Sequence, residues 1–246
     1  MATKIERTAP AREPLTKERI LAAAVALADD GGVEALSMRR LAQELGVVPM
    51  ALYKHVASKD EMLDGMVDVV VGEIDPPLAD ADWKTTMRER VLSARRTLLR
   101  HPWASKVIES RTNPTPTVIG YMDAMIGILR NGGFSVDLTH HAMHAMGSRA
   151  LGFSQELFDD TPDDPPAVQA IQAQWMAETY PNISEMVAGI THDDATVVGL
   201  GCDDQFEFEF TLDLMLDGLE QLRRNDSTGP RSPAGSPPAG KGRSGT

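Results

Sequence analysis

The chain has 246 residues, only one of them cysteine (Cys202), and a formal net charge of −12. That length accommodates one large or two small domains, and a single cysteine excludes a disulfide framework and suits a reducing cytoplasm. With neither a basic–apolar leader nor a run of 18 apolar residues, we expect no secretion and no membrane span. Residues 1–60 carry 9 Lys/Arg and 8 Asp/Glu, so the acidic charge lies almost entirely in residues 61–246. Any affinity for nucleic acid would therefore depend on a few hydrogen-bond donors at particular positions and not on a broadly basic surface.

The N-terminal region begins with residues 1–14, which are polar, contain two prolines and have no helical period. We predict a disordered arm here. The alternative is an arm that enters the DNA minor groove, with Lys4, Arg7 and Arg12 as its basic residues. Residues 16–30 follow as a predicted helix with Thr16 at its N-cap.

Residues 37–56, SMRRLAQELGVVPMALYKHV, read as two short helices joined by a tight turn. Ser37 is placed to cap the first helix, and Gly46 ends it because glycine tolerates a left-handed conformation. Pro49 fits only the first turn of the second helix, from which Leu52 and Val56 face back onto the first. This pattern is typical of a helix-turn-helix, which places its second helix in the DNA major groove. An ordinary antiparallel helix pair is the alternative.

The rest of the chain predicts further helices. Ser58 and Glu61 form a capping box before an apolar helix, which Asp75-Pro76-Pro77 ends. The later predicted helices span residues 82–100, a short segment ending near 110, 117–131, 136–158, 166–180 and 203–224. Residues 225–246 are rich in glycine and proline and are predicted to be disordered.

The last predicted helix carries two apolar stripes. The first repeats at steps of four and three residues and consists of Phe208, Leu212, Met215, Leu219 and Leu222, and the second consists of Phe206, Phe210 and Leu214. One stripe can bury against its own domain, but the second needs another surface. We predict a homodimer interface through this helix and the 136–158 helix; a helix buried all round in a monomer is the alternative.

Four segments together resemble the tetracycline-repressor (TetR) family. They are ILAAAVALADDGG, LAQELGV, ALYKHV and SKDEMLDGM, within residues 15–74, and a weaker similarity runs through LLRHPWASKVIESRT, LRNGGFS and LGF at 151–153. The resemblance implies an all-α protein. Its parts would be a three-helix helix-turn-helix DNA-binding domain over 15–74 and a helical ligand-binding and dimerisation domain over 75–224.

The resemblance also assigns candidate DNA contacts. Arg39 matches an arginine that reads a guanine edge, and its fork of donors suits the O6 and N7 acceptors. The positions that match backbone contacts are Tyr53, His55 and Lys59. Lys54 shares their helix face, and the base-facing tip consists of Pro49, Met50 and Ala51. The family more often has Ser or Thr near this tip, which leaves the operator sequence open.

Candidate effector contacts lie in the second half of the chain. By resemblance, His140, Met143, His144 and Ser148 line a cavity; satisfied core histidines are the alternative. The residues that could add an adaptable apolar wall are Trp103, Met122, Met125 and Trp175. The family's chelating histidines would fall near Asp75 and Ile108, neither of which is histidine, so a magnesium–tetracycline ligand does not fit. We predict no metal site and no cofactor.

No phosphate loop, nucleophile elbow or metal quartet supports an enzyme. The sequence therefore predicts a cytoplasmic DNA-binding transcriptional regulator, a repressor that a small molecule releases from a palindromic operator. The first alternative is a carrier or enzyme with a vestigial DNA-binding head. The second is a constitutive DNA-binding protein without an effector.

Overall fold

The computed structural model describes residues 14–151, 174–175, 177–182, 184–185 and 204–228, and these contain helices and no strand. The all-α prediction is therefore confirmed for this part of the chain. The helices with printed bounds are α1 (Lys17–Gly31), the 3-10 turn η1 (Val33–Ala35), α2 (Met38–Glu44), α3 (Pro49–Leu52), α4 (Lys59–Gly72), α5 (Trp83–Arg100), α6 (Ala104–Ser110), α7 (Pro116–Asn131), α8 (Val136–Leu151) and α11 (Asp204–Thr228).

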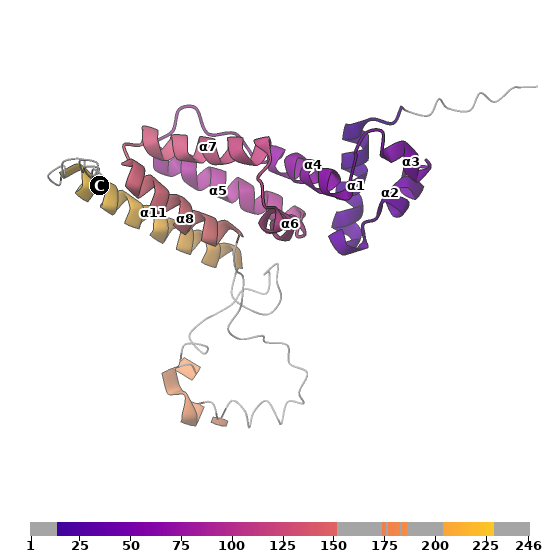
Figure 1. The fold of residues 1–246 in the computed structure, drawn as a ribbon. Coiled ribbons are helices and arrows are strands. Elements are labelled where there is room, and N and C mark those ends of the chain that lie inside the picture. The colour runs from indigo at the N-terminus through magenta and orange to yellow at the C-terminus, as the bar shows by residue number, and fades with distance from the viewer. Residues whose placement is uncertain (1–13, 152–173, 176, 183, 186–203, 229–246) are drawn as a thin grey trace, which may run out of the picture.

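The first three helices form a small head at one end of the molecule (Figure 1). The side chain of Thr16 accepts the Arg19 N–H, and that of Ser37 accepts the Arg40 N–H, each at 3.2 Å, so both predicted N-caps are confirmed. Gly46, which follows α2, has φ of 65°, as the predicted left-handed turn requires. Leu52 and Val56 are fully buried and pack on α1 and α2.

The second helix of the pair is shorter than predicted. α3 ends at Leu52, and residues 53–55 form a turn. The Leu52 carbonyl accepts the amides of both His55 and Val56, at 2.9 and 3.0 Å. This tightening of the last turn brings Val56 into the core without a further turn of helix.

α4 connects the head to the rest of the molecule. Ser58 caps it by accepting the Glu61 N–H, while the Glu61 carboxylate accepts the N–H of Ala57, one residue before the expected partner. The helix ends at Gly72, three residues before the Asp75-Pro76-Pro77 segment that was expected to end it. The head core continues through α4 into α6 and includes Trp103, Ala104 and Val107.

α5, α7, α8 and α11 form the bundle, whose core is built from all four helices (Figure 1). One expectation for a buried position was wrong. Leu222, which belongs to the first predicted stripe of the last helix, is 52% exposed, whereas Leu216 is fully buried. Trp83, the first residue of α5, donates a hydrogen bond to Glu220. α11 has therefore passed the N-terminal end of α5 before it reaches Leu222.

Several predictions lie outside the described residues. These are the arm over residues 1–13, the end of the 136–158 helix, most of the 166–180 helix and the tail beyond 228. In the part that the structure describes, no helix combines the length and the apolar character needed to cross a bilayer.

Candidate functional site

The predicted DNA contacts lie on the outer surface of the head. Arg39, Pro49, Met50, Tyr53, Lys54 and Lys59 are exposed, and Ala51 and His55 are half-buried. Within the described residues, none of the polar side chains in this set has a hydrogen bond or ion pair. Arg40 differs, because its guanidinium lies 3.8 Å from the Asp30 carboxylate. Arg39 therefore has donors available for a nucleic acid, whereas Arg40 is turned toward the protein.

The start of α4 is fixed to the start of α1. Lys17 Nζ lies 2.8 Å from Glu61 Oε1, and Glu61 also caps α4. The hydrogen bond from Lys17 holds the pKa of the Glu61 carboxyl below its usual value. This contact sets the position of Lys59, which begins α4 beside the helix-turn-helix.

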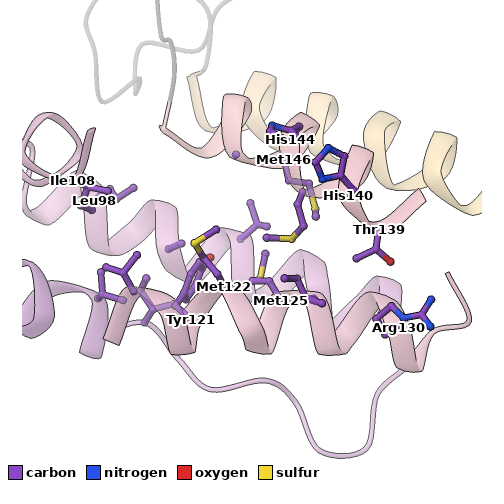
Figure 2. Close-up of a pocket in the computed structure, with 18 of the residues that line it drawn as sticks. Leu98, Ile108, Tyr121, Met122, Met125, Arg130, Thr139, His140, His144 and Met146 are labelled. Atoms are coloured by element: carbon purple, nitrogen blue, oxygen red, sulfur yellow. The ribbon is translucent and has the colours of Figure 1, made fainter. Parts of the chain in front are cut away.

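A cavity of about 690 Å³ lies between α4, α5, α6, α7 and α8 (Figure 2). The structure brings together five of the predicted effector residues in its wall: Met122, Met125, His140, Met143 and His144. The volume is within the range of small-molecule sites, which are typically apolar with a few placed polar groups. The apolar part of the wall reaches from Val70 and Val71 of α4, with Ile74 just beyond its end, to Met146 of α8.

The structure adds three polar lining residues that sequence reasoning missed: Tyr121, Arg130 and Thr139. A signal was present, because Arg130 continues the four-residue spacing of Met122 and Ile126 along α7. Burial raises the pKa of Tyr121, while the Arg90 guanidinium, 4.8 Å from the ring centroid, acts in the opposite direction. The Tyr121 hydroxyl is therefore a protonated donor at neutral pH.

The other predicted effector residues do not line the cavity as described. Trp103 is buried in the head core, and Trp175 is exposed and contacts the ring of Tyr180. Ser148 lies in α8, but its side chain is outside the described residues. Of the two positions that match chelating histidines, Ile108 lines the cavity. The Asp75 carboxylate instead accepts bonds from Ser93 and Arg96.

A polar clasp joins the head to the bundle and consists of Asp29, Glu73, Arg100, His101 and Trp103. Asp29 Oδ1 lies 2.8 Å from His101 Nδ1 and 2.7 Å from Trp103 Nε1. Glu73 Oε2 accepts from Arg100 at 2.8 Å and lies 3.3 Å from His101 Nε2. The hydrogen bond from Arg100 lowers the pKa of Glu73. Sequence reasoning missed the clasp because its partners lie up to 74 residues apart.

More polar contacts tie α6 and the following loop to the head. Lys106 Nζ lies 2.7 Å from Glu34 Oε1, and Arg111 Nη1 lies 3.1 Å from Asp60 Oδ1. The Thr115 hydroxyl, at the N-cap of α7, donates to Asp68 of α4. Since Ile108 and Val118 line the cavity, the segments that hold the head also form part of the cavity wall.

Comparison with known proteins decides the family. The tetR family of bacterial regulatory proteins matches residues 20–66, and the tetracyclin repressor-like C-terminal domain matches residues 75–223. The chain belongs to the tetracycline-repressor family. As a TetR-family protein it is a DNA-binding transcriptional regulator with a helix-turn-helix and a helical ligand-binding domain.

Three TetR-family relatives illustrate the range of similarity. The transcriptional repressor DrrR1 of Streptomyces coeruleorubidus is 30% identical over 232 residues, which cover 89% of this chain and 84% of DrrR1. The class D tetracycline repressor of Escherichia coli is 30% identical over 141 residues, 56% of this chain and 64% of the relative. The crystal structure of ActR of Streptomyces coelicolor in complex with (S)-DNPA has a TM-score of 0.65 and 28% identity, and covers 86% of this chain and 100% of ActR.

Proposed function

We propose that this TetR-family regulator is a repressor whose homodimer binds a palindromic operator and is released when a small molecule enters the cavity. One observation carries the proposal. α4 contributes Met62 and Met66 to the head core near one end and Val70, Val71 and Ile74, at and just beyond its other end, to the cavity wall. A ligand that pushes against this wall shifts the helix on which the head is mounted.

The energetic requirement is a difference in ligand affinity between two states. The ligand must bind the conformation with displaced heads more tightly than the conformation that fits the operator. A packed wall of methionines suits this, because methionine side chains adapt to a ligand and transmit its volume to their neighbours. The clasp and the contacts of Lys106, Arg111 and Thr115 hold the head against the segments that would move.

The DNA contacts follow from the exposed surface of the head. We propose that Arg39 reads a base edge and that Tyr53, His55 and Lys59 contact phosphates. Lys54 joins them on the same surface, and Pro49, Met50 and Ala51 meet the floor of the major groove. Apolar groups at this tip can touch thymine methyls but donate no hydrogen bond.

The homodimer is proposed on the outer face of α11. Phe206, Phe210 and Leu214 repeat every four residues and are all more than half exposed. Leu212 and Leu219, by contrast, are buried in the bundle of their own chain. The exposed stripe therefore supplies the apolar surface that a partner would cover, and α8 lies beside α11 to extend it (Figure 1).

The proposed location is the cytoplasm, because a regulator that binds an operator must share a compartment with the DNA.

Selection from a random DNA library tests operator binding. We expect enrichment of an inverted repeat, with a binding constant that falls as salt rises. Failure to enrich any sequence would favour a ligand carrier or enzyme. Compounds found by thermal shift are then added to the complex; binding compounds that leave the complex intact would favour a constitutive DNA-binding protein.

A cavity-filling variant links release to this cavity. Gly147 lines the cavity, and a Cβ added there meets no atom of the described residues within 4 Å, so Gly147→Phe should fill the space while the operator is still bound. Gly120→Phe is the matched control, because Gly120 has similar room but lies outside the cavity wall. We expect ligand-induced release to be lost only in Gly147→Phe. Equal release in both variants would place the effector elsewhere.

A further inference from the structure

The cavity carries a charge opposite to that of the domain around it. Of the 20 described residues that line it, Arg130 alone is permanently charged, and none is Asp or Glu. Residues 61–246 nevertheless carry 28 Asp/Glu against 15 Lys/Arg. Acidic side chains are thus abundant in the domain but kept out of the cavity, which has donors and one fixed positive charge.

These polar groups are not spread evenly along the cavity. Arg130 lies near the end of α7, and Thr139 and His140 lie in the first turns of α8, which the short connection 132–135 brings to the same end. Leu98 and Ile108 lie at the opposite end, where the polar side chain nearest to them in the view is that of Tyr121 (Figure 2). Val118 and Arg130 are twelve positions apart on one helix, which corresponds to about 18 Å.

Arg130 is held in place with most of its donors unused. One of its terminal nitrogens donates to the Phe134 carbonyl, just beyond the end of α7. No other hydrogen bond or ion pair joins the guanidinium to the described residues. An arginine fork fixed in this way suits a carboxylate or another planar oxyanion, which it can bind through two parallel hydrogen bonds.

We infer that the effector is an elongated apolar molecule with an acidic group, bound with the acidic group at Arg130 and the apolar body along the methionines toward Ile108. The inference rests on the proposed effector role of the cavity. Arg130 is exposed at the end of the cavity, and a ligand with a cationic group would meet its like charge there with no carboxylate among the described lining residues to compensate. A neutral ligand loses only the contribution of the ion pair.

Three ten-carbon probes that differ only in the head group test the inference: decanoate, 1-decanol and decylamine. Their binding to the full-length protein is measured by calorimetry at pH 7.5, without DNA. We expect decanoate to bind at least about tenfold more tightly than decylamine, with 1-decanol in between. Decylamine binding as tightly as decanoate, or binding of none of the three, overturns the inference.

Variants of Arg130 assign the preference to its side chain. Arg130→Gln should weaken the binding of decanoate about tenfold and change the affinity for 1-decanol by less than about twofold. Arg130→Lys keeps the charge and should retain the preference for decanoate over decylamine even if the glutamine variant folds poorly. Arg224→Gln removes the same charge from α11, outside the cavity wall, and should leave the affinities for all three probes unchanged. Equal weakening of decanoate and 1-decanol by Arg130→Gln would show a structural role only.

The two proposals fail in distinguishable ways. Loss of the decanoate preference, with operator binding and the effect of Gly147→Phe intact, refutes the acidic ligand but leaves the regulator. Failure to select any operator, with the decanoate preference intact, refutes the regulator but leaves an acid-binding cavity.

Discussion

Replacing Asp29 with alanine would remove one carboxylate from the clasp between head and bundle. Asp29 Oδ1 lies within 2.8 Å of His101 Nδ1 and Trp103 Nε1, and both of these side chains are buried, at 7% and 6% exposed. A carboxylate only accepts hydrogen bonds, so His101 Nδ1 and Trp103 Nε1 are both donors to Asp29. A buried donor left without an acceptor costs about 1–3 kcal/mol. Because the Asp29 side chain is 30% exposed and water can enter from that side, we take the lower half of the range for each.

The expected loss for Asp29→Ala is therefore about 2–4 kcal/mol in the free energy of unfolding, measured by urea denaturation at pH 7. Both bonds go to Oδ1, so Asp29→Asn can keep them on its amide oxygen, and it should lose about half as much because the acceptor is no longer charged. Asp30→Ala is the matched control, since its neighbouring carboxylate is 81% exposed and has only a 3.8 Å ion pair with Arg40. That pair should contribute less than about 0.5 kcal/mol. Equal losses for Asp29→Ala and Asp30→Ala would refute the assignment of the clasp as a buried structural contact.

Four further outcomes test the DNA contacts, the dimer and the loss of stability at low pH. Arg39→Ala should cost ~1–3 kcal/mol on the selected operator and relax one base position, measured by fluorescence anisotropy; an equal loss on random DNA would contradict base reading. Lys59→Ala should weaken binding to all DNA sequences and lower the slope of log affinity against log salt concentration by about one counterion; an unchanged slope would contradict a phosphate contact. Phe210→Glu should yield a folded monomer in sedimentation, whereas a charge at the buried Leu212 should unfold the chain; a dimeric Phe210→Glu would move the interface elsewhere. Hydrogen bonds from Arg223 and Arg224 lower the pKa of Glu220 to about 2, below its ordinary 4.5. Its stabilising contribution is thus present above pH 4.5 and lost as pH falls toward 2, so between pH 5 and pH 3 the urea midpoint should fall less in Glu220→Gln than in wild type; equal falls would contradict the shift.

Local features of the sequence predicted most of the described helices and several of their ends. Thr16, Ser37 and Ser58 cap helices because a side-chain oxygen satisfies an N–H close by in the chain, and Gly46 ends α2 because a positive φ costs glycine little. The family resemblance added the head and the candidate contacts. These features are readable because each depends on residues within one or two turns.

Interactions between distant residues were decided only by the tertiary structure. Periodicity placed Leu222 inside, but α11 runs past the residue at which α5 begins, which leaves Leu222 exposed, and Leu216 is buried instead. The same reason explains why the clasp could not be found, since Asp29 meets Trp103 only after α6 has packed on the head.

For the cavity, the sequence by itself determined which side chains are available, namely methionines, histidines and an arginine at helical spacing. Only the packing of α4, α5, α6, α7 and α8 decided that Trp103 belongs to the head core and that Arg130 lines the cavity. A residue's helix face follows from its spacing along the chain. Whether that face meets a core, a cavity or solvent depends on which helix lies opposite, and that is settled by the sum of contacts across the whole fold.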